Sequence, residues 1–523
     1  MTLGLTPDML VPLPVVVPLI AAGMTLVATR RTRTQRLITV SALTLTVAVS
    51  AALVYLSDTR GPQVVNVGGW SPTEGIVLIA DRLASLMLLV SVVVTLAVVL
   101  FSIGEGRSSF DEESDGQAPL AIFHPTLLVL SAGVSTTFLS GDLFHMYVGF
   151  EMLLAASFVL LTLGGTRERV RAGVNYVAVS LVSSLVFLSA IALVYAAAGT
   201  VNLAHLAYRL SSVDEDTKLA LELMLLLGFG IKAAVFPMSG WLPDSYPTAP
   251  ASVTAVFAGL LTKVGVYAII RTEVLLFPDD RVSPMLLIAA ALTMVVGILG
   301  AVVQDDIKRM LSFTLVSHIG FMIFGIALGG ELGLSAAIFY VVHHILIQSS
   351  LFLVAGLIER RGGTTSTMRL DRLATTSPLV AILFFVPAMN LGGIPPFSGF
   401  VAKVGLIEAG VADGGWLAYT LVAASVVTSL LTLYALSRTW ARAFWRPPFS
   451  EDGRPLRDLP DPERDVSQAL VPGVVTPTIL LIGVGLGLSV AAGPLFAFTD
   501  RAAFDLLETV VYTQAIFPEG VPE

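Results

Sequence analysis

The sequence contains no cysteine among its 523 residues. This absence excludes disulfide bonds, thiolate metal sites, iron–sulfur clusters and thiol nucleophiles. Charge is also scarce, because Lys, Arg, Asp and Glu make up only 13% of the chain, about half the share of an average soluble domain. The net charge is −8 and no sizeable basic patch occurs, so nucleic-acid binding is excluded as well.

Apolar side chains take the place of the missing charge. Hydrophobic residues make up 55% of the chain and the mean hydropathy is +0.85. A soluble protein of this length has too little interior to hide so many, so we predict an all-α polytopic membrane protein. A span needs roughly 20 apolar residues. Such runs predict about 14 transmembrane helices, near residues 9–29, 36–56, 78–102, 123–140, 143–164, 173–198, 218–239, 248–271, 283–303, 307–328, 333–358, 378–411, 416–445 and 470–498.

Lys and Arg gather in alternate connections, and such an excess marks the cytoplasmic side. The rich connections hold Arg30, Arg31, Arg33, Arg36, Arg107, Arg167, Arg169, Arg171, Lys308, Arg309, Arg360, Arg361, Arg369, Arg372, Arg438, Arg442, Arg446, Arg454, Arg457 and Arg464. The poor connections hold Arg60, Arg82, Arg209, Lys218, Arg271, Arg281 and Arg501. With an even number of spans, both termini are therefore expected outside.

Four ionisable residues lie deep within predicted spans: Glu151, Lys232, Lys263 and Lys403. A charge at mid-bilayer costs about 2.5–3.5 kcal/mol on insertion scales, so these groups should face the bundle interior, pair, or line water. Burial favours a neutral lysine and a nearby carboxylate favours a charged one. A lysine under both influences can take up and release protons, as a proton relay requires. A purely structural ion pair is the alternative, but one carboxylate cannot neutralise three lysines.

Two similar pentapeptides interrupt apolar runs: PMSGW from Pro237 and PFSGF from Pro396, which follows Pro395. Gly and Pro break helices, and breaks at corresponding places in two halves of a membrane protein indicate a transport site. Lys232 lies five residues before Pro237. We therefore expect its ammonium near backbone carbonyls that the break leaves unpaired.

Three of the six histidines lie well inside predicted spans, away from the span ends: His318, His343 and His344. A neutral imidazole can pass a proton through either nitrogen, so these three are further relay candidates. No carboxylate stands at ligand spacing from them, which disfavours a metal site. No motif of a hydrolase, a nucleotide-binding loop or a zinc protease stands in plausible context. We expect no cofactor and a transporter component rather than an enzyme.

Six segments carry a family resemblance: LFHMYVGFE, GFGIKAAVFPMSGWLPDSYPTAPASV, GLLTKVGVYAIIR, DDIKRMLSFTLVSHIGFMIFG, HHILIQSSLFLVAGLIERR and GIPPFSGFVAK. In these the chain resembles the antiporter-like subunits shared by respiratory complex I and the Mrp-type cation/proton antiporters. The resemblance runs from the third predicted span to about residue 445. Within the family the chain looks most like the D-type component of Mrp antiporters.

The resemblance implies fourteen helices with two inverted five-helix repeats, helices 7 and 12 being broken. It divides the chain into helices 1–3 (1–122), a first repeat of helices 4–8 (123–275), a second repeat of helices 9–13 (276–446), and a polar connection with helix 14 (447–523). It also implies a bacterial inner (plasma) membrane protein.

The resemblance further implies a midplane proton relay of Glu151, Lys232, Lys263, His318, His343, His344 and Lys403. It implies secondary active exchange of Na⁺ (or Li⁺, K⁺) for H⁺ together with partner subunits of the Mrp A, B, C, E, F and G types. Two residues depart from the family pattern. Gln348 stands where relatives usually carry a lysine, so the relay would rely on the histidines and water there. His145 stands where relatives usually carry asparagine.

Two other functions stay open. The chain could be a proton-pumping subunit of complex I or of a membrane hydrogenase, in which the same residues would work with a different energy source. It could also be a non-transporting scaffold, but the insertion cost of the buried charges argues against that.

Overall fold

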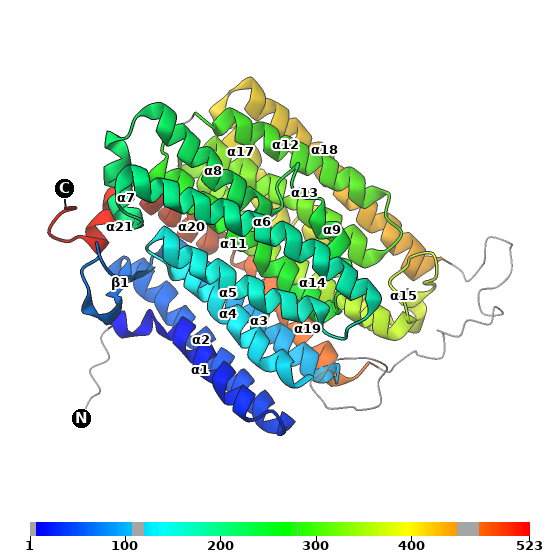
Figure 1. The fold of residues 1–523 in the computed structure, drawn as a ribbon. Coiled ribbons are helices and arrows are strands. Elements are labelled where there is room, and N and C mark those ends of the chain that lie inside the picture. Colours follow the sequence, from blue (N-terminus) through cyan, green and yellow to red (C-terminus); the bar gives the residue numbers. More distant parts are fainter. Residues whose placement is uncertain (1–6, 107–119, 280, 447–469, 523) are drawn as a thin grey trace.

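The computed structural model describes residues 7–106, 120–279, 281–446 and 470–522. These ranges form a bundle of long helices that run along one common direction (Figure 1). Eleven helices in the described ranges are long and apolar enough to cross a bilayer. The prediction of an all-α multi-pass membrane protein is confirmed, while the count of fourteen helices and the two inverted repeats stay predictions.

The amino-terminal part contains α1 (Leu13–Val27), α2 (Thr32–Arg60), β1 (Gln63–Asn66), β2 (Val77–Ala80) and α3 (Arg82–Gly104). The next part contains α4 (Phe123–Leu139), α5 (Leu143–Thr162), α6 (Arg167–Ala198), α7 (Leu203–Arg209), α8 (Glu215–Ala233), α9 (Trp241–Ser245), α10 (Ala251–Val256) and α11 (Thr262–Leu276). A π-helical turn, Phe257–Leu261, joins α10 to α11.

The following part contains α12 (Ser283–Val302), α13 (Ile307–Leu328), α14 (Gly330–Gly362), α15 (Leu373–Thr376), α16 (Pro378–Gly392), α17 (Ser398–Asp413) and α18 (Trp416–Trp440). The last part contains α19 (Pro472–Val490), α20 (Ala492–Leu507) and α21 (Thr509–Ile516). The polar connection of the expected fourth segment, residues 447–469, lies outside the described residues, as does Arg107. The division into four segments stays a prediction.

The two ends of the bundle differ. β1, α7 and α21 lie at one end, which we call the terminal end, and α15 lies at the other (Figure 1). The two strands pair antiparallel, with Gln63 opposite Ala80. This small hairpin was not predicted. It forms because two short segments, each containing β-branched residues, flank a turn in which Gly68 and Gly69 have positive φ.

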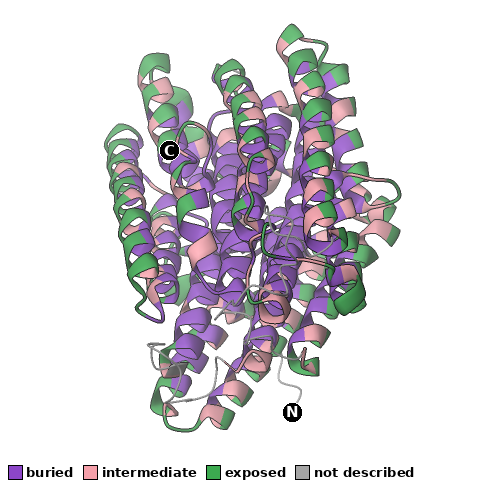
Figure 2. Ribbon diagram, turned by 90° about the vertical axis from the view of Figure 1, so that its right-hand side faces the viewer, coloured by how far each residue is buried: buried purple, intermediate pink, exposed green. Residues whose placement is uncertain are grey.

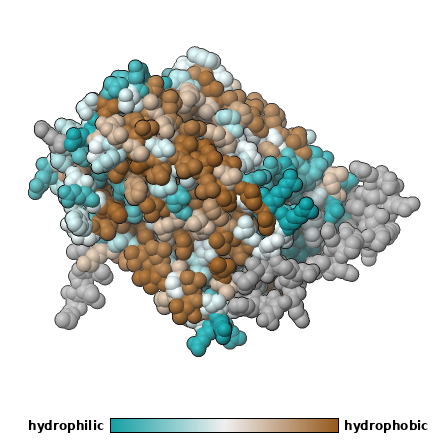
Figure 3. Space-filling model, in the orientation of Figure 1, coloured by the Kyte–Doolittle hydropathy of each residue, from teal (hydrophilic) through white to brown (hydrophobic). Residues whose placement is uncertain are grey.

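The core of the bundle is α14 together with the continuous helix of α10 and α11. The most apolar stretch of each is entirely buried. Peripheral helices instead expose one face, and Figure 2 shows this division between a buried interior and an exposed rim. In Figure 3 apolar side chains cover the middle of the visible flank, with hydrophilic groups toward the two ends. Such a distribution suits a protein whose flank faces lipid or other apolar helices.

Glycine allows close helix packing between α12 and α13. A Cβ at Gly297 would lie only 2.5 Å from the backbone nitrogen of Ser317, and one at Gly320 would lie 2.7 Å from the Ala290 oxygen. Small residues at such crossings let the backbones approach, which is a common means of packing helices within membranes.

The chain leaves the helical conformation at both predicted breaks. α8 ends at Ala233, where Ala234 adopts a left-handed φ of 60°, and α9 begins at Trp241. α16 ends at Gly392, Gly393 has a φ of 82°, and α17 begins at Ser398. The run 378–411, predicted as one apolar span, is thus two helices.

The placement of Arg271 in a connection was wrong. This residue lies within α11 and is only 1% exposed. Its guanidinium pairs with the Asp81 carboxylate at 2.6 Å, and the pair lets α11 continue to Leu276 despite the charge. A buried arginine needs such a partner, because removing either member would leave an uncompensated charge.

Candidate functional site

Glu151 and Lys232 are joined through a serine. Glu151 lies on α5, Ser184 on α6 and Lys232 on α8. The Ser184 hydroxyl donates to Glu151 Oε1, and Lys232 Nζ donates to Ser184 Oγ at 3.2 Å. Lys232 Nζ also lies 5.9 Å from the centre of the Phe150 ring. A carboxylate and an ammonium linked by one hydroxyl form a unit in which a proton on one member changes the energy of the other.

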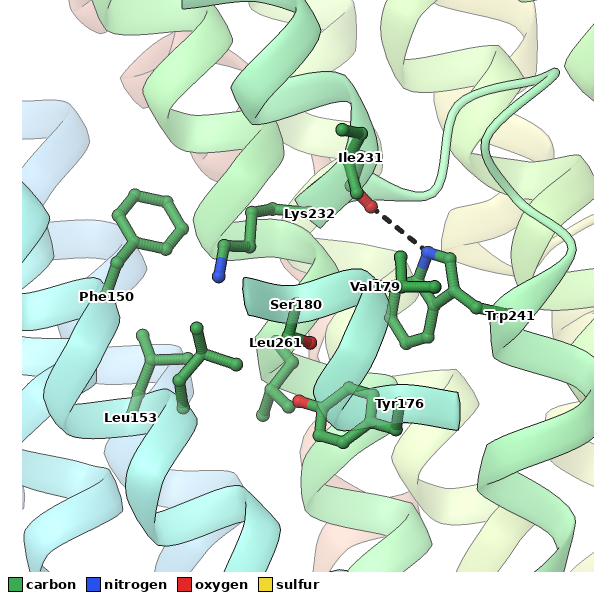
Figure 4. Close-up of a pocket in the computed structure, with 10 residues that line it drawn as sticks. Phe150, Leu153, Tyr176, Val179, Ser180, Ile231, Lys232, Trp241 and Leu261 are labelled. Atoms are coloured by element: carbon green, nitrogen blue, oxygen red, sulfur yellow. Dashed lines mark hydrogen bonds between the residues drawn. The ribbon is translucent and has the colours of Figure 1, made fainter. Parts of the chain in front are cut away.

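A small cavity adjoins this unit. Its volume is about 20 Å³, and Lys232, Ser180, Tyr176, Phe150 and Trp241 are among its lining residues. Figure 4 shows the Lys232 side chain extending between the Phe150 and Ser180 sides of this space. A volume of this size holds about one water molecule. A water molecule, which can accept a proton, therefore fits beside the Lys232 amine.

The Lys232 ammonium does not contact the carbonyls at the α8 break, contrary to expectation. The indole Nε1 of Trp241 donates to the Ile231 carbonyl at 3.2 Å (Figure 4). The Lys232 ammonium points instead to Ser184. Trp241 follows the break directly, and its ring folds back over the end of α8 and donates to a carbonyl that also accepts from the Ala234 amide at 3.2 Å.

Lys263 lies in the centre of the bundle and has no exposed surface. Its Nζ donates to the carbonyl of Ala258 at 2.7 Å and lies 3.3 Å from Thr262 Oγ1. Ala258 belongs to the π-helical turn Phe257–Leu261. Such turns are frequent at functional sites.

Lys403 shows the arrangement that was expected of Lys232. Its Nζ donates to the carbonyls of Leu391 and Gly392, at 3.1 and 3.2 Å, at the very end of α16. The ammonium also lies 5.3 Å from the centre of the Phe321 ring. The end of a helix thus provides an uncharged cradle for the cation, because its last carbonyls have no partners within the helix.

The three histidines of the prediction cluster between these lysines. His318 on α13 shares a hydrogen bond of 2.9 Å with the Tyr340 hydroxyl through Nδ1, and its Nε2 lies 3.5 Å from Thr432 Oγ1. The His318 and His344 ring centres are 5.2 Å apart. Both ring nitrogens of His344 are buried, and no group of the described residues hydrogen-bonds to them. Neither nitrogen is therefore held by a partner among these residues, and the bare nitrogen of the neutral ring can accept a proton.

His343 faces the second break rather than the other two rings. Its Nδ1 shares a hydrogen bond of 2.9 Å with Ser398 Oγ, and Ser398 donates to Asn390 Oδ1 at 3.3 Å. A Cβ at Gly399 would lie 3.0 Å from the His343 ring and would clash with the Asn390 carbonyl oxygen. The break therefore fits closely around the imidazole.

The structure gathers the seven predicted residues into two groups. Glu151 and Lys232 form the first. The second comprises Lys263, His318, His343, His344 and Lys403, within which His344 interacts electrostatically with the other four. No hydrogen bond or electrostatic interaction among the described residues joins Lys232 directly to Lys263. The groups are nevertheless neighbours, since a Cβ at Gly265 would lie 2.7 Å from the Ala233 nitrogen.

The departure at Gln348 also has a defined contact. This side chain is fully buried on α14 and donates from Nε2 to the Leu311 carbonyl at 2.7 Å. It therefore binds the backbone of α13 and bears no charge. The three break prolines, Pro237, Pro395 and Pro396, lie exposed at the surface of the bundle. They shape the chain around the site rather than taking part in it.

The sequence alone did not single out Ser184, Tyr340, Asn390, Ser398 or Thr432 as members of the site. These polar residues lie among apolar neighbours in the sequence. The same is true of many serines and threonines whose side chains only hydrogen-bond to the backbone of their own helix. Only the packing of separate helices shows which of them touch an ionisable group. The spacing of Asn390 and Ser398 across the Gly-Pro break is a signal that could have been noticed.

Comparison with known proteins places this geometry in a family. The NADH:quinone oxidoreductase/Mrp antiporter transmembrane family matches residues 140–432, a range that contains every predicted relay residue. A protein of Alkalihalophilus pseudofirmus, named as the D component of a Na⁺/H⁺ antiporter, is 34% identical over 513 residues, covering 98% of this chain and 99% of the relative. The chain belongs to the NADH:quinone oxidoreductase/Mrp antiporter family.

Solved structures of the family agree with this placement. A chain of the Mrp complex from Dietzia sp. superposes with a TM-score of 0.86 at 34% identity, covering 99% of this chain and all of that chain. A chain of respiratory complex I from Thermus thermophilus superposes with a TM-score of 0.80 at 22% identity, covering 96% and 99%. The second likeness shows that the antiporter family and complex I share the fold.

Proposed function

We propose that this chain is the proton-translocating subunit of a multi-subunit Na⁺/H⁺ antiporter in a bacterial plasma membrane. The proposal is supported by the full-length similarity to a protein named as the D component of a Na⁺/H⁺ antiporter and to a chain of an Mrp complex. The transport is secondary active, so the existing proton gradient drives it. The partners are the other Mrp-type subunits, and both termini face the outside.

The single observation that carries the proposal is the row of ionisable groups inside the bundle, of which five are buried and two, Glu151 and Lys232, are half-buried. Protons pass from one half-channel to the other through Glu151, Lys232, Lys263, His318, His343, His344 and Lys403. Each transfer changes the charge beside the next group. Because the surroundings are apolar, that change is felt far more strongly than in water.

Lys232 acts as the switch between the two groups of the row. While Lys232 is charged, it holds Ser184 and the Glu151 carboxylate together. When Lys232 gives up its proton, the Glu151 carboxylate loses its positive partner. The unpaired negative charge then favours uptake of another proton. Alternation between these states moves protons past α8.

The test is Lys232→Ala in the assembled complex, with Na⁺-driven dissipation of a pH gradient in vesicles as the measurement. Exchange should fall to background while the complex still assembles. Lys308→Ala is the matched control, because Lys308 pairs with Glu359 at 2.6 Å, away from the row. Undiminished exchange in Lys232→Ala would refute the proposal.

A further inference from the structure

The small cavity beside Lys232 offers a proton very few partners. Among the described residues that line it, only Lys232, Tyr176, Ser180 and Trp241 have polar side chains, and the others are apolar. The Trp241 indole can only donate, and its N–H already donates to the Ile231 carbonyl. A proton that leaves Lys232 through this cavity therefore meets the hydroxyl of Tyr176 or that of Ser180.

Tyr176 is fixed firmly at the wall of the cavity. It lies on α6 and is only 2% exposed. Its ring centre lies 5.4 Å from that of Trp241 and 5.5 Å from that of Phe158. Figure 4 shows the Tyr176 hydroxyl between Trp241 on one side and the Lys232 amine on the other. The packing of the ring thus keeps the hydroxyl at the cavity.

The hydrogen bonds beyond Tyr176 have a defined direction. Its hydroxyl shares a bond of 2.9 Å with the hydroxyl of Ser157 on α5. Ser157 donates its own hydrogen to the Leu154 carbonyl at 2.7 Å, so Tyr176 is the donor in the shared bond. The Tyr176 oxygen can then accept from a water in the cavity, and that water can accept from the Lys232 ammonium. One water therefore completes a series of hydrogen bonds that are all donated in the same direction, from Lys232 to Ser157.

This series leads away from the terminal end. α5 begins at the terminal end, where Asp142 pairs with Asn202 beside α7, so it ends on the side of α15. Ser157 lies five residues before Thr162, the last residue of α5, which is about 7.5 Å along the helix. The connection that follows is exposed at Gly165. Ser157 is therefore close to the α15 end of the bundle.

We propose that Tyr176 and Ser157, with one water in the cavity, form the path by which Lys232 exchanges protons with water at the α15 end. An N–H bond of the ammonium breaks, the water takes that proton, and the water gives one of its own to Tyr176. Tyr176 passes its hydroxyl proton to Ser157, and Ser157 releases its proton toward the end of α5. One proton moves, and both hydroxyls are neutral before and after. The inference rests on the proposed function, because it needs Lys232 to gain and lose protons.

The experiment is Tyr176→Phe in the assembled complex in vesicles, which removes the hydroxyl and keeps the ring. Na⁺-driven dissipation of a pH gradient should fall by at least about tenfold, because a positioned proton-transfer group typically contributes more than that. Tyr195→Phe is the matched control, because Tyr195 lies on the same helix with 59% of its surface exposed, and its rate should not change. Unchanged exchange in Tyr176→Phe would overturn the proposal.

The ratio of the exchange rates in H₂O and D₂O separates proton transfer from packing. Removal of a proton-carrying hydroxyl makes proton transfer the slow step, so the ratio should rise in Tyr176→Phe at equal amounts of assembled complex. A hydrogen bond that only holds α5 against α6 would affect assembly or melting temperature and leave the ratio unchanged, which would overturn the proposal. If Tyr176→Phe does not assemble, Ser157→Ala breaks the same series at its next member and should show the same fall and the same rise.

Lys232→Ala distinguishes this path from the function on which it rests. Loss of exchange in Lys232→Ala together with full exchange in Tyr176→Phe would refute the path alone. Undiminished exchange in Lys232→Ala would refute the proposed function.

Discussion

Ser184 is the residue on which the first group depends most directly. Its hydroxyl is the only hydrogen-bonded link between Glu151 and Lys232 within the described residues. A hydrogen bond to a charged group contributes about 1.5–3 kcal/mol. Ser184 therefore does more than pack α6 against its neighbours.

We expect Ser184→Ala to lower Na⁺/H⁺ exchange by about tenfold to a hundredfold, the kinetic equivalent of that hydrogen-bond energy. Ser183→Ala is the matched control, because Ser183 donates to the Gly228 carbonyl and no hydrogen bond among the described residues joins it to an ionisable group. The measurement is the rate of pH-gradient dissipation at equal amounts of assembled complex. Equal rates in the two variants would contradict the role of the serine link.

At this scale the sequence predicts the charged members of the site and not their partners. Lys263 and Lys403 stand out because charge inside an apolar run is costly. Ser184 and Ser398 do not stand out, because serine within membrane helices usually bonds its own backbone.

Among the elements, α5 has a cap with an unusual environment. Asp142 precedes the helix, and its Oδ1 accepts from the His145 amide at 2.5 Å. Its Oδ2 is buried and has no partner among the described residues. Burial raises the pKa of the Asp142 carboxyl to about 6, against an ordinary value of 3.8.

This cap makes the free energy of unfolding depend on pH. The folded protein holds the Asp142 proton more tightly than the unfolded chain does. The resulting stabilisation is complete below about pH 4 and is lost as the pH rises through about 6. A difference of about two pKa units corresponds to about 3 kcal/mol.

Asp142→Asn should remove that dependence while keeping the cap, because asparagine caps helices as well as aspartate does. Thermal unfolding of the purified complex from pH 4 to pH 8 is the measurement. The stability of the unchanged protein should fall more steeply than that of the variant. Asp214→Asn, at the exposed cap of α8, is the control and should not flatten the profile. A parallel profile for Asp142→Asn would refute the prediction.

The break between α16 and α17 leaves no room for a side chain at Gly399. A Cβ at Gly399 would clash with the Asn390 carbonyl oxygen and would lie 3.0 Å from the His343 ring. Gly399→Ala should therefore destabilise the protein by about 1–3 kcal/mol, as overpacking does, and should slow exchange by displacing His343. Melting temperature and exchange rate measured together check this. Gly483→Ala on α19, with nothing within 4 Å of the added methyl, should be neutral or slightly stabilising.

Both breaks were predictable from Gly and Pro, and their consequences differ for a physical reason. The tryptophan after the first break reaches back to the Ile231 carbonyl. The second break has a phenylalanine at the corresponding place, Phe400, which cannot donate a hydrogen bond, and Lys403 takes the free carbonyls. The pentapeptides alone did not reveal this difference, because it depends on which side chain packs against the carbonyls in the folded bundle.

For the whole molecule, hydropathy predicts a polytopic bundle because the bilayer allows so few alternatives. It does not predict the small hairpin, the burial of Arg271 or the order in which helices pack. Those depend on contacts between segments far apart in the chain, such as Arg271 with Asp81. The division of the predicted residues into two groups is likewise a property of the packed bundle.

We propose that one row, running from Glu151 to Lys403, carries the protons through both groups. The most direct measurement is Na⁺-driven pH-gradient dissipation in vesicles that contain the whole complex with Lys403→Ala, with Lys308→Ala as the control. A single row predicts that Lys403→Ala abolishes exchange as completely as Lys232→Ala does. Retention of about half the exchange rate, or more, would show that the two groups work separately and would contradict the account.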